Sequence, residues 1–290
     1  MTHSMHPVTV TLDLENHLGP QHAPRFEAPT QRILGLWAEL GLQGTVFVVG
    51  ELARQAPDLI KTIADAGHEI GYHSRNHRPL TDETPERLTH EAGDDKRWLE
   101  DITGQPVRGY RAPVMSLVRK SAWVTETLME LGFDYSSSVL PGWSPLYGFA
   151  EAPSTPFRWQ SGLIELPAPV FKPGRLFART ALPYIGGIYL RYLPRAIIER
   201  AHRGLPTESS LPWAYIHPYD LDTDEPFRRM PDTALWVAIL LWFNRRGTEK
   251  KFKRLFSGPN QFPTAGPLAE RIDRELNTQA LPVFDPGQII

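Results

Sequence analysis

Val8-Thr9-Val10-Thr11-Leu12-Asp13-Leu14-Glu15 is a run in which apolar and polar side chains alternate strictly. This period of two is typical of a β-strand with one buried face. Asp13 and Glu15 both leave the polar face, with Cα atoms roughly 6.5 Å apart along the strand. Two carboxylates at that distance repel each other unless a cation, a proton or a substrate lies between them. The strand therefore ends either in a solvated acidic pair or in a site where one carboxylate binds a metal and the other accepts a proton from water.

Strands and helices alternate along the rest of the chain. The apolar run 44–50 and the segment 68–73 are predicted strands, and residues 29–40 and 52–67 are predicted helices. This order implies a parallel sheet whose strands are joined by crossover helices. The further elements expected are strands at 107–111, 134–139, 163–166 and 214–217 and helices at 85–103, 116–131 and 233–256.

Roughly seven β/α units predict an α/β fold whose sheet closes, or nearly closes, into a barrel. We expect one barrel domain over residues 1–257, including the last helix, and a C-terminal tail over residues 258–290. The sites of such barrels lie at the carboxyl ends of the strands. Asp13, His73, Arg111 and His217 all fall at predicted strand ends, and Asp134 opens a strand. This clustering predicts a site rather than packing.

Composition limits the chemistry. The 290 residues include no cysteine, which excludes disulfides, thiolate catalysis and Cys-type metal sites, so a metal must be bound by His and carboxylate. The net charge is −2, which gives no indication of a nucleic-acid partner. No secretory signal pattern precedes the first strand, and the apolar run 234–243 is too short to span a bilayer, so we expect a cytoplasmic protein.

His73-Ser74-Arg75-Asn76-His77 places two imidazoles four residues apart just after a strand. If the chain turns helically there, both rings face one way and can share a metal with a carboxylate, leaving open positions for water and substrate. With these motifs the chain resembles the polysaccharide deacetylase (NodB-type) family. The segments that carry the resemblance are 11–15, 73–77, 109–113, 133–138 and 215–218, and the segments 182–191, 217–222 and 244–249 are similar to the subgroup found beside exosortase/PEP-CTERM exopolysaccharide loci.

The resemblance implies a distorted (β/α)7-type barrel and one divalent metal, with Zn²⁺ expected and Co²⁺, Ni²⁺, Mn²⁺ or Fe²⁺ as alternatives. It assigns Asp13 as the base and Glu15, His73 and His77 as ligands. Most members have two adjacent aspartates in the first motif, whereas Leu14 stands at the second position here, so the ligand role falls to Glu15.

The same chemistry gives four further groups a role. Arg111 holds Asp13 ionised, His217 protonates the leaving amine, and Asp134 orients His217. A backbone N–H within residues 134–138 is expected to stabilise the oxyanion. The residues expected to contact the saccharide are Tyr110, Pro113, Tyr135 and Trp143.

The predicted function is metal-dependent removal of an N-acetyl group from an amino sugar. The substrate is a saccharide, or a nucleotide- or lipid-linked precursor. The alternatives are a deformylase for a lipid-linked aminosugar, a metal-independent allantoinase-like cyclic-amide hydrolase, and an inactive saccharide-binding barrel. The basic end of the helix at 233–256 is either a solvated face, which is favoured, or a peripheral contact with the inner membrane.

Overall fold

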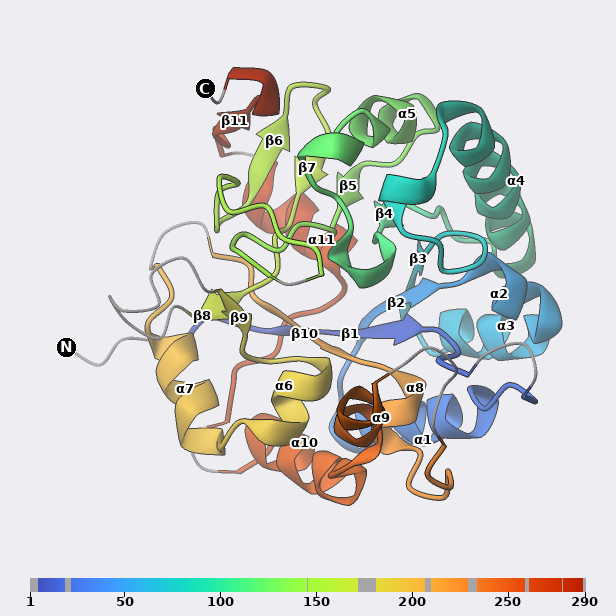
Figure 1. The fold of residues 1–290 in the computed structure, drawn as a ribbon, viewed down its shortest axis with the longest axis vertical. Helices are drawn as coiled ribbons and strands as arrows, with labels where there is room; N and C mark the ends of the chain where they lie inside the picture. The colour runs from blue at the N-terminus through green and yellow to red at the C-terminus, as the bar shows by residue number, and fades with distance from the viewer. Residues whose placement is uncertain are drawn as a thin grey trace.

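The computed structural model describes residues 5–18, 22–144, 146–171, 181–206, 210–228, 234–258, 261–277 and 279–288. Within these residues a nine-stranded sheet has the order β10-β1-β2-β3-β4-β5-β7-β6-β11 (Figure 1). Neighbouring strands from β10 to β7 are parallel, whereas β6 is antiparallel to β7. The strands are β1 (Thr9–Leu14), β2 (Gly44–Val48), β3 (Glu69–Tyr72), β4 (Gly109–Tyr110), β5 (Tyr135–Ser136), β6 (Phe157–Trp159), β7 (Ile164–Glu165), β10 (Trp213–Ile216) and β11 (Val283–Phe284).

Helices lie around the outside of this sheet (Figure 1). They are α1 (Glu27–Glu39), α2 (Gly50–Gln55), α3 (Pro57–Asp65), α4 (Pro85–Thr103), α5 (Val124–Glu130), α6 (Gly187–Tyr192), α7 (Arg195–Arg203), α8 (Pro218–Leu221), α9 (Leu235–Trp242), α10 (Thr248–Phe256) and α11 (Leu268–Arg271). A small separate sheet pairs β8 (Val170–Phe171) with β9 (Leu182–Pro183).

The barrel is closed by a side chain. Among the described residues, β10 and β7 do not pair with each other, although they end the run of parallel strands. The indole Nε1 of Trp213 donates a hydrogen bond to the carbonyl oxygen of Leu166, 3.2 Å away, and so links the two edges. The predicted distorted barrel is confirmed, with a gap in its strand pairing at this point.

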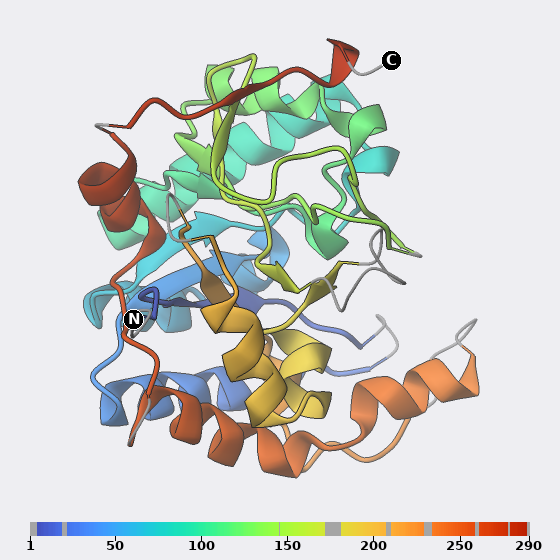
Figure 2. The same cartoon turned by 90° about the vertical axis from the view of Figure 1, so that its left-hand side faces the viewer.

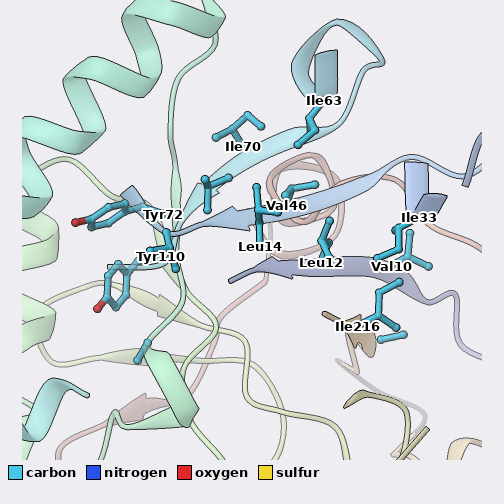
Figure 3. Packing of buried hydrophobic residues seen from close by; sticks show 14 of the residues in the cluster. Val10, Leu12, Leu14, Ile33, Val46, Ile63, Ile70, Tyr72, Tyr110 and Ile216 are labelled. Atoms are coloured by element: carbon cyan, nitrogen blue, oxygen red, sulfur yellow. The ribbon is translucent and has the colours of Figure 1, made fainter. Parts of the chain in front are cut away.

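The alternation in β1 separates two environments. Val10, Leu12 and Leu14 are buried against the helix layer, where they pack with residues such as Ile33 and Val46 (Figure 3). The intervening side chains face the barrel interior, since a strand sends successive residues to opposite sides. Thr11 there donates to the Ala214 carbonyl and Asp13 contacts Arg111.

The C-terminal segment covers the amino-terminal end of the barrel. Val8 exchanges backbone hydrogen bonds with Pro263 and Ala265. The first N–H groups of α11 donate to Thr45 Oγ1 (2.9 Å) and Glu69 Oε2 (3.1 Å), which lie at the starts of β2 and β3. The opposite end of the barrel, where the strands finish, is left for the site.

The predicted helix at 233–256 is two helices, so this prediction was wrong. Phe243 is extended and Asn244 takes a left-handed conformation with φ of 63°, which Asn tolerates better than most residues. A short 3₁₀ turn then leads into α10. The break is fixed because Asn244 Nδ2 donates to the Arg191 carbonyl at 2.6 Å. The first position of the predicted helix, residue 233, lies outside the described residues.

Candidate active site and metal centre

The two carboxylates that end β1 are buried side by side at the carboxyl end of the barrel. Asp13 is 3% exposed and Glu15 is 8% exposed, while Leu14 between them is buried in the helix-facing core. The strand alternation therefore brings Glu15 rather than residue 14 to the site. Burial by itself would raise the pKa of Glu15, but the imidazoles of His77, His217 and His73 hold that pKa well below its usual range.

Glu15, His73 and His77 form the candidate metal centre. One ligand atom from each lies within 4.8 Å of the others. His73 Nε2 is 3.5 Å from Glu15 Oε2, and His77 Nε2 contacts the same oxygen. The segment between the histidines is not helical, because Ser74 and His77 have positive φ angles of 62° and 59°. The two rings nevertheless converge, with centroids 5.2 Å apart.

The orientation of His73 suits a metal ligand. Its Nδ1 lies 2.7 Å from the Arg111 carbonyl oxygen, which can only accept a hydrogen bond, so the Nδ1 atom carries the proton. The unprotonated Nε2 is then directed toward Glu15. A backbone carbonyl behind a ligating imidazole is the usual way that proteins fix such a ring. Two imidazoles and one carboxylate with open positions fit a catalytic divalent ion such as Zn²⁺.

Asp13 is held by a cation inside the barrel. Arg111 Nη1 donates to Asp13 Oδ1 (2.6 Å) and to Thr11 Oγ1 (2.8 Å), and Arg111 is fully buried. Its guanidinium lies between the rings of Phe47 and Trp213, at 4.0 and 4.1 Å. A buried carboxylate needs such a charge-assisted partner to stay ionised. The second oxygen, Asp13 Oδ2, faces His217 Nε2 at 3.9 Å.

His217 follows β10 and faces both carboxylates. Its Nε2 lies 3.9 Å from Glu15 Oε1, and its Nδ1 lies 2.9 Å from Asp220 Oδ2. The ring stacks on Tyr219 with centroids 4.6 Å apart. Burial by itself would lower the pKa of His217, but the charges of Glu15 and Asp220 outweigh it and raise the pKa to about 9. His217 is therefore protonated at neutral pH in this arrangement.

Asp134 lies at the wrong end of the barrel for the role predicted for it. It precedes β5, so it falls at the amino-terminal end of that strand, and it is half-exposed in an ion pair with Arg108. Asp220 contacts His217 instead. Asp220 lies in the segment 217–222, but no role was predicted for it from the sequence. The available signal was its position three residues after His217, in the first turn of a helix.

Tyr110 and Tyr135 do not reach the cavity, so their predicted contact with the saccharide is wrong. Both are fully buried; Tyr110 packs against the Tyr72 and Phe133 rings, and Tyr135 donates to Glu69 at 2.8 Å. Each belongs to a two-residue strand, which is too short for alternation to show which face a side chain takes.

Pro113 is buried and does not line the cavity either, although its neighbours Ala112 and Val114 do. Trp143 is 59% exposed on a loop whose next residues reach the cavity, so a contact through it stays a prediction. The backbone N–H groups of Ser137 and Ser138 already donate to Tyr110 O and Glu165 Oε1. Neither is available for the oxyanion role expected of residues 134–138.

A cavity of about 250 Å³ opens over the carboxylates and imidazoles. Its floor is formed by Asp13, Glu15, His73, His77 and His217. Its walls come from several segments, among them Met115, Tyr147, Ile188, Tyr189, Tyr215 and Leu241. The structure thus brings together all the predicted site residues except those corrected above and Trp143.

Comparison with known proteins agrees with this geometry. Residues 7–135 match the family model described as polysaccharide deacetylase, and residues 137–267 match a domain of unknown function, DUF3473. Over residues 7–135 the chain is therefore similar to the polysaccharide deacetylase family, in line with the resemblance carried by its motifs. His217 and its partner Asp220 lie in the second match. The resemblance to the exosortase-locus subgroup stays a prediction.

Curated relatives are similar over parts of the chain. A peptidoglycan-N-acetylmuramic acid deacetylase of Bacillus subtilis is 31% identical over 104 residues, which are 36% of this chain and 39% of that protein. A chitooligosaccharide deacetylase of Azorhizobium caulinodans is 29% identical over 100 residues, 34% of this chain and 45% of that protein. The chain thus spans about two fifths of the length of such relatives.

The fold has a counterpart along nearly its whole length. A crystal structure assigned as a polysaccharide deacetylase from Mycobacterium smegmatis has a TM-score of 0.60 and covers 97% of this chain and 98% of that one. The sequence identity is 18%, so the likeness concerns the fold alone.

Proposed function

We propose that the protein hydrolyses the N-acyl bond of an amino sugar, with acetyl as the expected acyl group and a divalent metal ion as cofactor. The observation that carries this proposal is the convergence of three groupings on one cavity. These are the Glu15–His73–His77 donors, the Asp13–Arg111 pair and the His217–Asp220 pair. The family match and the names of the relatives support the same reaction.

Glu15, His73 and His77 would hold the ion, with Zn²⁺ expected and Co²⁺, Ni²⁺, Mn²⁺ or Fe²⁺ as alternatives. When bound, such an ion polarises the amide carbonyl and lowers the pKa of the attacking water. Asp13 accepts the proton of that water at Oδ2, since Oδ1 is engaged by Arg111. The water oxygen bonds to the acyl carbon as the proton leaves.

The N–H group of Val114 is the proposed donor to the oxyanion. Val114 lines the cavity, and its N–H donates to no acceptor within the described part of the chain. Val114 and Met115 have φ angles of 50° and 56°, which are strained for residues other than glycine, most of all for a β-branched one. Backbone strain of this kind is often found where a site fixes a backbone group for catalysis.

His217 donates its Nε2 proton to the amide nitrogen as the C–N bond breaks, which releases a carboxylate and leaves a free amine on the sugar. Asp220 holds Nδ1 on the far side of the ring and so directs Nε2 into the cavity. Asp13 and His217 therefore divide the base and acid roles.

The test combines metal content with released acid. Purified protein and the variants Glu15→Ala and His77→Ala are analysed for bound metal by mass spectrometry and for acetate release from N-acetylglucosamine oligosaccharides. We expect about one equivalent of metal and acetate release in the natural protein, both lost in the variants. His90→Ala is the matched control, because His90 is an exposed imidazole paired only with Asp94. A natural protein that releases acetate without metal, or that binds no metal after incubation with Zn²⁺, Co²⁺ and Ni²⁺, contradicts the mechanism.

A further inference from the structure

Helix α9 exposes an unusual apolar surface. Residues 234–243 include no charged side chain, and Ala238 is buried while the larger residues around it are not. The exposed fractions are 50% for Leu235, 68% for Trp236, 46% for Ile239, 38% for Trp242 and 55% for Phe243. An apolar patch of this kind on a protein surface marks a contact with another protein, a ligand or a membrane.

The surface borders the mouth of the candidate active site. Helix α9 (orange) and the loop formed by residues 141–144 and 146–148 (yellow-green) project to the same side of the molecule (Figure 2). Leu146 in that loop is 77% exposed. Leu146 and Leu241 both line the catalytic cavity, so the apolar rim and the cavity are continuous.

Helix α9 is anchored at its C-terminal end. Arg191 Nη1 donates to the Leu241 carbonyl at 2.7 Å, and Tyr192 donates to the Leu240 carbonyl at 2.9 Å. The indole of Trp242 donates to the Glu225 carbonyl at 2.9 Å. The first two bonds satisfy carbonyls at the end of the helix and the third ties its last residue to a neighbouring segment, so its exposed face is presented by a fixed element.

Cations flank the apolar face. Arg228, Arg246 and Lys250 are exposed on the segments on either side of α9. Three other basic residues of this region are engaged within the chain: Arg245 pairs with Glu225, Lys251 donates to carbonyls at the end of α6, and Lys253 pairs with Glu39. Arg254 is exposed at the far end of α10. The sequence favoured a solvated face for the basic end and left a membrane contact as the alternative, and that alternative gains an apolar helix beside the cations.

We propose that α9 and Leu146 beside it dock on an anionic lipid bilayer, with the catalytic cavity opening toward the headgroups. Trp side chains favour the membrane–water interface, and an apolar face flanked by cations is typical of shallow interfacial binding. In the described part of the chain, no helix is long and apolar enough to cross a membrane, which fits contact with one surface. If the proposed deacetylation is also correct, the geometry favours an amino sugar carried on a lipid.

The experiment is co-flotation of the whole protein with vesicles of phosphatidylcholine alone or mixed with phosphatidylglycerol. We expect the natural protein to bind the mixed vesicles. The double variant Trp236→Asp/Ile239→Asp should bind at least about tenfold more weakly, because it lacks two large apolar side chains whose transfer from water to the membrane favours binding. Arg246→Gln/Lys250→Gln is expected to remove the preference for phosphatidylglycerol. Val283→Asp is the matched control, since Val283 is 69% exposed on β11, away from the apolar surface of α9.

Two results would overturn the proposal: no flotation of the natural protein with mixed vesicles, or flotation unchanged by the double variant. A dimer that Trp236→Asp/Ile239→Asp dissociates in light scattering would instead assign the surface to a second copy of the chain. Glu15→Ala is expected to float like the natural protein, and Trp236→Asp/Ile239→Asp to retain activity on a water-soluble oligosaccharide. Failure of the membrane contact and failure of the proposed chemistry are therefore distinguishable.

Discussion

Asp220 lies between His217 and Arg191, with Oδ2 at 2.9 Å from His217 Nδ1 and Oδ1 at 3.1 Å from Arg191 Nε. All three side chains are buried or nearly so, and Arg191 comes from α6, in the part of the chain that matches DUF3473. The second half of the chain therefore supplies both the imidazole and the charges that orient it, whereas the first half supplies the proposed metal donors and the proposed base.

Replacing Asp220 should move the alkaline limb of the pH–rate profile. In the proposed mechanism His217 donates a proton, so activity is present below the pKa of His217 and is lost as pH rises through it, and the Asp220 carboxylate raises that pKa. Asp220→Asn removes a charge that raises this pKa, so the loss of kcat/KM with rising pH should begin at lower pH. Asp224→Asn, a nearby exposed carboxylate, is the control. If the alkaline limb of the pH–rate profile is unchanged in Asp220→Asn, the Asp220 carboxylate contributes only to packing and does not raise the pKa of His217.

Replacing Asp13 alone and replacing Glu15 alone should have different effects on metal content. Asp13→Asn keeps all three metal donors, so metal content should stay near one equivalent while kcat falls about 10²–10⁴-fold through loss of the base. Glu15→Ala should lose the metal as well. Circular dichroism checks that Asp13→Asn, which leaves Arg111 without its carboxylate, remains folded. Loss of metal in Asp13→Asn would place Asp13 among the ligands.

His202 should make the fold sensitive to mild acid. It is fully buried, with Nε2 2.8 Å from the His6 carbonyl and Nδ1 2.9 Å from the Tyr184 hydroxyl. Burial lowers its pKa to about 4 from 6.5, so below pH 6.5 the unfolded chain binds a proton that the folded chain does not. Stability should therefore fall as pH drops from 6.5 toward 4, by up to about 3 kcal/mol.

Urea unfolding measured across that pH range tests this expectation. The free energy of unfolding of His202→Gln should be lower at neutral pH but should vary less between pH 6.5 and 4. Parallel curves for the two proteins would mean that other groups cause the acid sensitivity.

Gly186 should tolerate no side chain. A Cβ there would lie 1.9 Å from Cδ1 of Tyr215, a residue that lines the catalytic cavity. Gly186→Ala should cost about 1–3 kcal/mol of stability and reduce activity, because the Tyr215 ring must move. Gly35→Ala is the matched control: a Cβ in that exposed helical position meets nothing within 4 Å and should stabilise α1 by about 0.5–1 kcal/mol. Thermal unfolding and acetate release measure both effects.

Long periodic segments were predictable from the sequence, and short ones were not. The six residues of β1 alternate clearly enough to assign Leu14 to the core and Glu15 to the barrel interior. The two-residue strands β4 and β5 give no such pattern, so the sequence did not show that Tyr110 packs in the helix-facing core or that Tyr135 lies deep in the barrel beside Phe47. The assignment of Asp134 failed for a related reason: a residue that opens a strand lies at the far end of the barrel from residues that close one.

The break between α9 and α10 depends on tertiary contacts. Apolar and basic residues continue across residues 233–256, and the local signals against a continuous helix are Asn244 and Gly247, neither of which requires a break. Its left-handed conformation is held by the Arg191 carbonyl, more than fifty positions earlier in the chain. Local propensity cannot reveal a partner at that separation.

The position of β1 sets the order in which the protein can be completed. β1 pairs with β2, which follows it closely, and with β10, where Thr11 bonds to Ala214 across 203 positions. During synthesis, β1, β2 and β3 emerge together with the proposed metal donors that follow β1 and β3, whereas His217 arrives much later. A nascent chain can thus gather these donors long before it gains the proposed proton donor, and the long-range docking of β10 is the step that completes the proposed site.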